Sequence, residues 1–364
     1  MTTTPITWAN GYYTRGTSEI PGVYSASYRL NDLIAQNLID PDSARNFLIE
    51  AGLTDFVWEV TWADDSETQP EVINARFSAG QGYVVFIHGW TGNHSIWESL
   101  PALVAANDRR LISISVDHNG FGQSELIDDT PRLENCNPPA AMKTIEAWVD
   151  LMCLRNQPQP KVINFVGHSM GGAALFYLDP LKWKTGEETR YAVAPALLLE
   201  DELNQVFFTT LGIGIGIVNF LPVFEIVERA LKPSVIDALC QGASSYVKET
   251  HNIQYNETAR STTAATFVAM GLLRDREIAR NFDLFRVILG HRDRLVDVIA
   301  MMDLLNQLEF PAQNIRVVAG THYLFSVGID SVFAHAQNRE LIVQDIVNLH
   351  EQAFALLRQS IRLG

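Results

Sequence analysis

The sequence is poor in cysteine and has no cluster of basic residues. Its three cysteines, at positions 136, 153 and 240, are odd in number and widely spaced. This spacing favours reduced thiols over the disulfide framework of small secreted domains. The chain has 27 lysines and arginines against 42 aspartates and glutamates, which gives a formal net charge of -15. Because a nucleic-acid surface needs a basic stripe, we expect no nucleic-acid partner.

A targeting signal and a metal-binding motif are lacking as well. The first eight residues contain no basic patch followed by an apolar segment, so we expect no signal peptide and a cytoplasmic protein. The nine histidines show neither His-x-His nor His-Glu-x-x-His spacing. We therefore expect no metal ion, and no motif indicates another cofactor.

A clean membrane-spanning segment is also missing. Residues 207–224 carry no charge and approach the length of a spanning helix. Three glycines, an asparagine and Pro222 interrupt this run, and no basic flank follows it. We expect these residues to form an apolar cap over a pocket. Contact of that cap with a membrane surface stays open, and so does the oligomeric state.

The rest of the sequence predicts an α/β protein. The chain has 364 residues, of which 47% are hydrophobic and 19% charged, as in ordinary globular domains. Continuous apolar segments alternate with helical patterns and predict strands at 83–87, 111–116, 161–166, 193–199, 285–289 and 315–318. Strands that are apolar throughout are typical of a mostly parallel sheet with helices on both faces.

The pattern divides the chain into three parts. Residues 1–55 form an N-terminal extension that we expect to be mostly helical, with two short helices joined near Asp40-Pro41-Asp42. Two alternating segments, 56–62 and 72–77, then predict an antiparallel pair. The expected parts are the extension (1–55), an α/β core (56–202 and 284–364) and an inserted helical cap or lid (203–283).

A glycine-flanked serine lies at the centre of this pattern. Ser169 comes directly after the predicted strand 161–166 and before a helix that begins near Ala173. A serine in a tight, positive-φ turn brings the positions two before and two after it together, so only small residues fit there. These positions are Gly167 and Gly171. The pattern predicts a nucleophile more strongly than a structural turn.

A serine nucleophile needs a base, and the base needs an orienting acid. Asp293 and His322 each follow a predicted strand, at the edge where open α/β sheets gather their sites. Glu200 and Asp201 follow an earlier predicted strand and are the alternative acids. The non-catalytic alternatives are that His322 is an ordinary loop histidine and that Asp293 only forms a salt bridge.

With these residues the sequence resembles the α/β-hydrolase-fold superfamily of esterase and lipase type. The resemblance covers roughly residues 56–200 and 284–364 and includes the Gly-His-Ser-Met-Gly elbow and the turns that carry His88-Gly89-Trp90, Asp293 and His322. It implies a Ser169-His322-Asp293 triad and an oxyanion hole made by the backbone N–H groups of Trp90 and Met170.

The segment 117–124 resembles the family's Asp-x-x-Gly-x-Gly-x-Ser loop, whose role is mainly structural. The chain departs from the family at His118-Asn119, where many members carry a basic residue or proline, and in its N-terminal extension. Neither departure touches the triad. We expect His88 to be a hydrogen-bonded scaffold residue and His168 to pack beside the nucleophile.

The implied function is hydrolysis of a carboxylic ester or lactone of a fairly apolar small molecule through an acyl-enzyme. Epoxide hydrolases and haloalkane dehalogenases share the fold but need an aspartate in place of Ser169. The alternatives are carbon–carbon bond hydrolysis of a diketone-type substrate with the same triad, and a non-catalytic ligand-binding protein on this scaffold. The sequence does not give the natural substrate or its acyl length.

Overall fold

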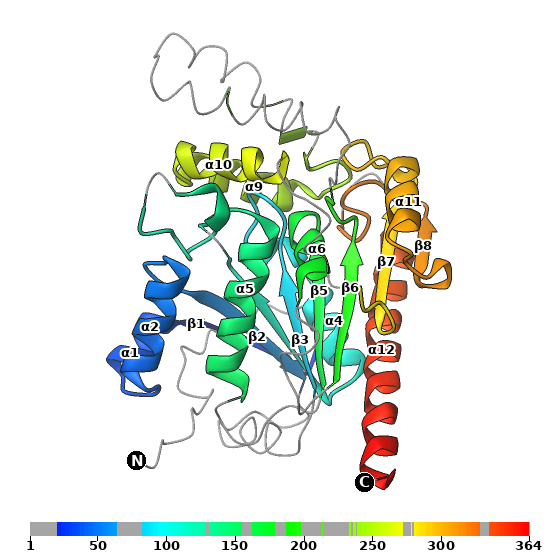
Figure 1. Ribbon diagram of the computed structural model, residues 1–364, viewed down its shortest axis with the longest axis horizontal. Coiled ribbons are helices and arrows are strands. Elements are labelled where there is room, and N and C mark those ends of the chain that lie inside the picture. The colour runs from blue at the N-terminus through cyan, green and yellow to red at the C-terminus, as the bar shows by residue number, and fades with distance from the viewer. Residues whose placement is uncertain are drawn as a thin grey trace.

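A twisted eight-stranded sheet with the order β1-β2-β4-β3-β5-β6-β7-β8 forms the centre of the protein (Figure 1). The strands are β1 (Val23–Arg29), β2 (Val57–Ala63), β3 (Gly82–Ile87), β4 (Leu111–Val116), β5 (Val162–His168), β6 (Glu187–Val193), β7 (Phe285–Gly290) and β8 (Ile315–Val318). Strand β2 runs antiparallel to β1 and β4, and the other neighbours are parallel. The predicted mostly parallel sheet is thereby confirmed.

This computed structural model describes only part of the chain. The described residues are 20–63, 82–118, 120–128, 131–154, 162–178, 187–197, 213, 233, 236–237, 239–271, 278, 280–327 and 335–363. The alternative acids Glu200 and Asp201 and the uncharged run 207–224, apart from residue 213, lie outside them. Among the described helices, none combines the length and the apolar character needed to cross a bilayer.

Helices cover both faces of the sheet. The helices with described bounds are α1 (Leu30–Ala35), α2 (Pro41–Ala51), α4 (Leu100–Asn107), α5 (Pro138–Val149), α6 (Met170–Ala174), α9 (Ser245–Glu257), α10 (Arg260–Gly271), α11 (Val298–Gln307) and α12 (His335–Leu363). In Figure 1, α5 and α6 lie in front of the sheet and α12 behind it, where α12 packs beside α4. Both faces of β3 and β4 are therefore buried, as their apolar sequences predicted.

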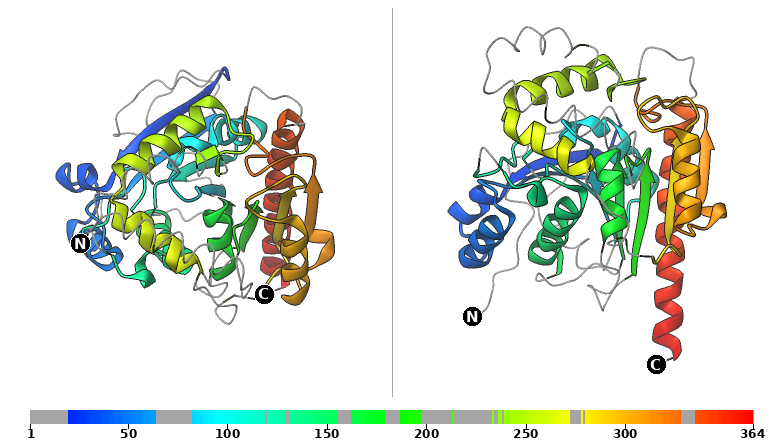
Figure 2. Two further views of the ribbon diagram at one scale, coloured as in Figure 1. Left: turned by 90° about the horizontal axis from the view of Figure 1, so that it is seen from above. Right: turned by 45° about the horizontal axis from the view of Figure 1, so that its top comes forward.

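Helices α9 and α10 lie over the edge at which the parallel strands end (Figures 1 and 2). Both belong to the segment that the sequence predicts as a cap. Ser244 caps α9 by accepting a hydrogen bond from the backbone N–H of Val247. Their position places buried side chains of α9 directly above the loops that follow the strands.

The N-terminal extension contains the two expected helices, α1 and α2, but also a strand that the sequence analysis missed. Strand β1 pairs along its whole length with β2, and Tyr28 stacks on Trp58 with ring centroids 5.8 Å apart. The neighbours of β2 are β1 and β4, whereas the expected partner 72–77 lies outside the described residues. Small and polar side chains dominate β1, so its sequence gives little alternation to recognise.

The strand predicted at 193–199 is wrong, because β6 ends where that segment begins. Ala194 has a φ of 44°, and Pro195 has no N–H for a sheet ladder, so the chain leaves the sheet after Val193. Strand β6 was not predicted because most of its residues are polar and do not form an apolar run. Thr189 donates a hydrogen bond to Asn164 Oδ1 (2.8 Å), and the Arg190 guanidinium lies over the Phe285 ring.

Helix α12 is fastened to the sheet by a buried carboxylate. Asp345 accepts hydrogen bonds from Arg286 Nη1 (2.9 Å) on β7 and from Tyr191 Oη (3.1 Å) on β6. Arg316 on β8 lies 3.4 Å from the same carboxylate, with a side chain 46% exposed. One side chain therefore joins the helix to three neighbouring strands.

Replacing Asp345 with Ala should lower the free energy of unfolding by about 2–3 kcal/mol, because two arginines lose their partner and Tyr191 loses its buried acceptor. The value is set below that of a fully buried pair because Arg316 is half exposed. Urea unfolding measures it, with Asp345→Asn as the matched variant that keeps an acceptor and should lose less. A loss below about 0.5 kcal/mol for Asp345→Ala would contradict this account.

Candidate active site

The predicted nucleophile turn is present between β5 and α6. Ser169 has φ 54° and ψ -117°, a conformation that L-residues rarely adopt. A Cβ on Gly167 would lie 2.2 Å from the Gly171 carbonyl oxygen, and one on Gly171 would lie 2.3 Å from the Ile87 oxygen. The Ser169 N–H donates to the Val193 oxygen (3.0 Å) and thus ties the strained residue to β6. Only glycines allow this turn to pack against β3.

Asp293 and His322 meet at the ends of β7 and β8. His322 Nδ1 lies 2.8 Å from Asp293 Oδ2, and the two side chains are 1% and 2% exposed. The other carboxylate oxygen accepts the backbone N–H groups of Leu295 and Val296, both at 2.9 Å. Because a carboxylate only accepts, Nδ1 is the donor in this contact.

The turns that carry Asp293 and His322 pack closely against each other at Gly290. A Cβ on Gly290 would lie 2.4 Å from the Thr321 carbonyl oxygen, so only glycine allows this approach. Gly290 also pairs with Val318 in the β7–β8 register. Sheet register and close packing together fix the separation of the acid and the histidine.

The serine turn lies beside the histidine turn. His168, which precedes Ser169, has its ring centroid 4.7 Å from that of His322, and its Nε2 donates to the His322 carbonyl oxygen (3.1 Å). Within the described chain no hydrogen bond joins Ser169 Oγ to the His322 ring. Such bonds are often long in unliganded enzymes and tighten when substrate binds. His168 packs as expected and also holds the His322 backbone.

Two backbone N–H groups beside Ser169 have no acceptor among the described residues. A Cβ on Gly89 would lie 2.9 Å from the Ser169 Cβ, so the turn that carries Trp90 packs directly on the serine turn. The N–H of Trp90 and that of Met170, the first residue of α6, donate to no other group in the described part of the chain. These are the two N–H groups that the family resemblance predicts for an oxyanion hole.

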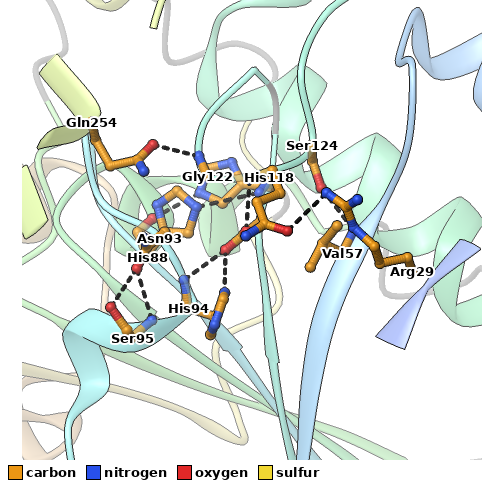
Figure 3. A network of polar contacts seen from close by, with 12 residues as sticks. Arg29, Val57, His88, Asn93, His94, Ser95, His118, Gly122, Ser124 and Gln254 are labelled. Atoms are coloured by element: carbon orange, nitrogen blue, oxygen red, sulfur yellow. Dashed lines mark hydrogen bonds and ion pairs between the residues drawn. The ribbon is translucent and has the colours of Figure 1, made fainter. Parts of the chain in front are cut away.

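A buried pair of histidines, His88 and His118, is hydrogen-bonded to the Gly89 turn (Figure 3 labels both histidines). His88 Nδ1 donates to the Gly89 oxygen (2.7 Å), and His118 Nε2 donates to the His88 oxygen (2.8 Å). Their rings stack with centroids 4.1 Å apart. Burial lowers the pKa of His88 well below its usual value and that of His118 to about 4. Both rings are therefore neutral and structural, as the expected scaffold role of His88 requires.

Asp117 organises the next loop and contacts a histidine that the sequence analysis missed. Its Oδ1 accepts from the backbone N–H (2.7 Å) and the Nδ1 (2.8 Å) of His94, and its Oδ2 accepts from Gln123 N–H (2.9 Å) (Figure 3). Gly122 is required here, because a Cβ would lie 2.1 Å from that carboxylate. No group of these residues or of the other described ones has the arrangement to hold a metal ion.

The proton of His94 is held by the acidic side chains around it. Burial by itself lowers the pKa of His94, but the charge and hydrogen bond of Asp117 and the charge of Glu59 raise it to about 9. His94, whose side chain is 20% exposed, is therefore protonated at neutral pH and forms an ion pair with the fully buried Asp117.

Comparisons with known proteins agree with this architecture. A family model described as the alpha/beta hydrolase fold matches residues 82–178, whereas no curated protein matches the chain. An esterase from Exiguobacterium antarcticum superposes with a TM-score of 0.55 at 14% identity, over 73% of this chain and 92% of that one. For an esterase from Thermogutta terrifontis the TM-score is 0.53 at 15% identity, over 82% and 97%.

An enol-lactonase from Burkholderia xenovorans LB400 superposes with a TM-score of 0.50 at 16% identity, over 82% of this chain and 96% of that one. At such identities the likeness shows a shared fold, and folds of this kind host many chemistries.

The raised pKa of His94 predicts a pH-dependent stability. Because folding raises this pKa from 6.5 to about 9, the folded state holds the proton more tightly. The resulting stability is fully present below pH 6.5 and is lost as the pH rises through about 9. Between these values the free energy of unfolding should fall by about 2–3 kcal/mol relative to His94→Gln. Denaturant unfolding at each pH measures this, and parallel curves for the two proteins would contradict it.

Proposed function

We propose that this chain, which has the α/β-hydrolase fold, is a serine hydrolase that cleaves a carboxylic ester or lactone of a fairly apolar small molecule. The buried contact between Asp293 and His322 carries the proposal. In the neutral ring this contact places the proton on Nδ1, so that the second nitrogen is an acceptor, next to a turn that presents a strained serine. An acceptor nitrogen beside a hydroxyl is what nucleophilic catalysis by serine requires.

In the proposed first step, Ser169 Oγ attacks the substrate carbonyl carbon while His322 Nε2 takes the hydroxyl proton. The carbonyl oxygen becomes negatively charged and accepts the N–H groups of Trp90 and Met170. The bond to the leaving alkoxide then breaks, His322 returns the proton to that oxygen, and an acyl-Ser169 ester remains. In a lactone the leaving hydroxyl stays attached to the acyl group.

In the second step His322 takes a proton from water, and the hydroxide attacks the acyl carbonyl. The same two N–H groups hold the second oxyanion until the Ser169–acyl bond breaks and the serine recovers its proton. Asp293 stabilises the imidazolium in both steps and keeps its own charge. Each oxyanion donor is expected to contribute about 3–4 kcal/mol to transition-state stabilisation.

An apolar substrate is supported by what covers Trp90. Phe267 of α10 packs edge-on against the Trp90 ring with centroids 3.9 Å apart, and Tyr255 of α9 lies at 6.2 Å. Both aromatic side chains come from the segment 203–283, which we propose is a cap over the site. The esterases and the enol-lactonase that share the fold are compatible with this substrate class.

Replacing Ser169 with Ala should abolish turnover of short p-nitrophenyl esters, because no other hydroxyl takes its place in the turn. Labelling by a fluorophosphonate probe should disappear in the same variant, and Ser95→Ala serves as a control away from the turn. Unchanged turnover in Ser169→Ala would refute the proposal. Faster cleavage of a diketone-type substrate than of any ester in a panel would instead assign the carbon–carbon reaction.

Replacing Asp293 with Asn should lower kcat by about 10³- to 10⁴-fold with little change in KM, because the amide favours the wrong imidazole tautomer. Glu200→Gln and Asp201→Asn provide the matched comparison and should retain nearly full kcat. If either of these variants loses activity and Asp293→Asn does not, the acid is assigned to the wrong residue.

A further inference from the structure

Another buried histidine, His251, connects helix α9 of the proposed cap to both turns of the site. His251 Nδ1 lies 2.9 Å from Thr91 Oγ1, and its Nε2 forms a short hydrogen bond with Tyr323 Oη. Thr91 follows Trp90 in the chain, and Tyr323 follows His322. One imidazole therefore bridges the immediate neighbours of a proposed oxyanion donor and of the proposed base.

The bridge is closed to water and uncharged. His251 and Tyr323 are each 1% exposed, and Thr91 is fully buried. Burial, together with the charge of His322 when protonated, lowers the pKa of His251 to about 3. A neutral imidazole has one donor and one acceptor, so it satisfies two hydroxyl groups at once. His251 is thus a fixed linker and is poorly suited to carry protons.

The bridge holds a strained residue. Thr91 has a φ of 51°, which is unusual for a β-branched side chain and costs on the order of 1–3 kcal/mol. The hydrogen bond between Thr91 Oγ1 and His251 Nδ1 offsets part of that cost. At the other end, the Tyr323 ring packs on His168 with centroids 4.4 Å apart, next to Ser169.

We propose that His251 is a positioning residue that holds the Trp90 turn and the His322 turn in register, so that the docking of α9 completes the oxyanion hole. This inference rests on the proposed serine hydrolase function. Displacement of a catalytic group by about 1 Å lowers the rate on the order of 10²-fold. Loss of the linker between the two turns can therefore lower the rate more than the small stabilities of its two hydrogen bonds would indicate.

Helix α9 also offers a matched control. Gln254 lies one turn beyond His251, is 6% exposed, and accepts a hydrogen bond from Gly122 N–H (2.8 Å) (Figure 3). It anchors the same helix to the same core, but to the loop that Asp117 organises. That loop carries no residue of the proposed triad or oxyanion hole. Gln254→Ala therefore removes a buried anchor of α9 whose hydrogen bond goes to neither turn.

The test compares kcat and KM for a short p-nitrophenyl ester. His251→Gln keeps a polar group near the Nε2 position and loses the hydrogen bond to Thr91. His251→Asn keeps a polar group near the Nδ1 position and loses the hydrogen bond to Tyr323. Each should lower kcat by about 10- to 100-fold with KM changed less than about threefold, because the loss falls on the transition state. Gln254→Ala should keep kcat within about threefold of wild type.

A double-mutant cycle sharpens the test. Tyr323→Phe should lower kcat as much as His251→Asn does. The double variant should lose little more than either single variant, because both substitutions remove the same hydrogen bond, between His251 Nε2 and Tyr323 Oη. Urea unfolding of every variant separates misfolding from misplacement. If a His251 variant does not fold, Tyr323→Phe still decides the question.

The outcomes separate this inference from the proposal on which it rests. Unchanged kcat in the His251 and Tyr323 variants of an active wild type, or a loss confined to KM, overturns the positioning role alone. An equal loss of kcat in Gln254→Ala also overturns the positioning role, because any side chain that anchors α9 would then have the same effect as His251. A wild type whose ester turnover does not depend on Ser169 overturns both.

Discussion

The site depends on the buried hydrogen bond between Asp293 and His322. A carboxylate removed from water is costly unless its oxygens are satisfied, and here one oxygen accepts two backbone N–H groups while the other accepts the imidazole. The parallel pairing of β7 with β8 and the absence of a Cβ at Gly290 bring the two turns close enough for this bond. The geometry of the site is thus a consequence of sheet register.

Histidines around the site take different roles because their surroundings differ. His88, His118, His168 and His251 are buried, and burial lowers the pKa of each, so they act as neutral hydrogen-bonding groups. His94 faces Asp117 and holds its proton at neutral pH. Four neutral rings and one charged ring thereby fix the loops around Ser169 and leave proton transfer to His322 in the proposed mechanism.

Much of the architecture could be predicted from the sequence because it depends on the pattern of residues that are close together in the chain. Apolar runs gave most of the parallel strands, and glycines two residues either side of Ser169 gave the strained turn. The contact between Asp293 and His322 followed from their places after two strands, although their catalytic role stays a prediction. The acids at 200 and 201 lie outside the described residues.

What the sequence could not predict depends on distant partners. Strand β1 is recognisable only beside β2, and the polar β6 is stable only because Asn164 and Phe285 receive its side chains. His251 is 160 positions from Thr91. No local signal distinguishes its helix from any other amphipathic segment, and only the folded chain brings the three groups together.

The most direct measurement is a crystal structure of the protein after reaction with an alkyl phosphonate. We expect a covalent bond to Ser169 Oγ, a phosphoryl oxygen that accepts hydrogen bonds from the N–H groups of Trp90 and Met170, and His322 Nε2 within hydrogen-bond distance of the serine oxygen. A phosphonate on another residue, or a His322 ring that stays out of reach of Ser169 while bonded to Asp293, would contradict it.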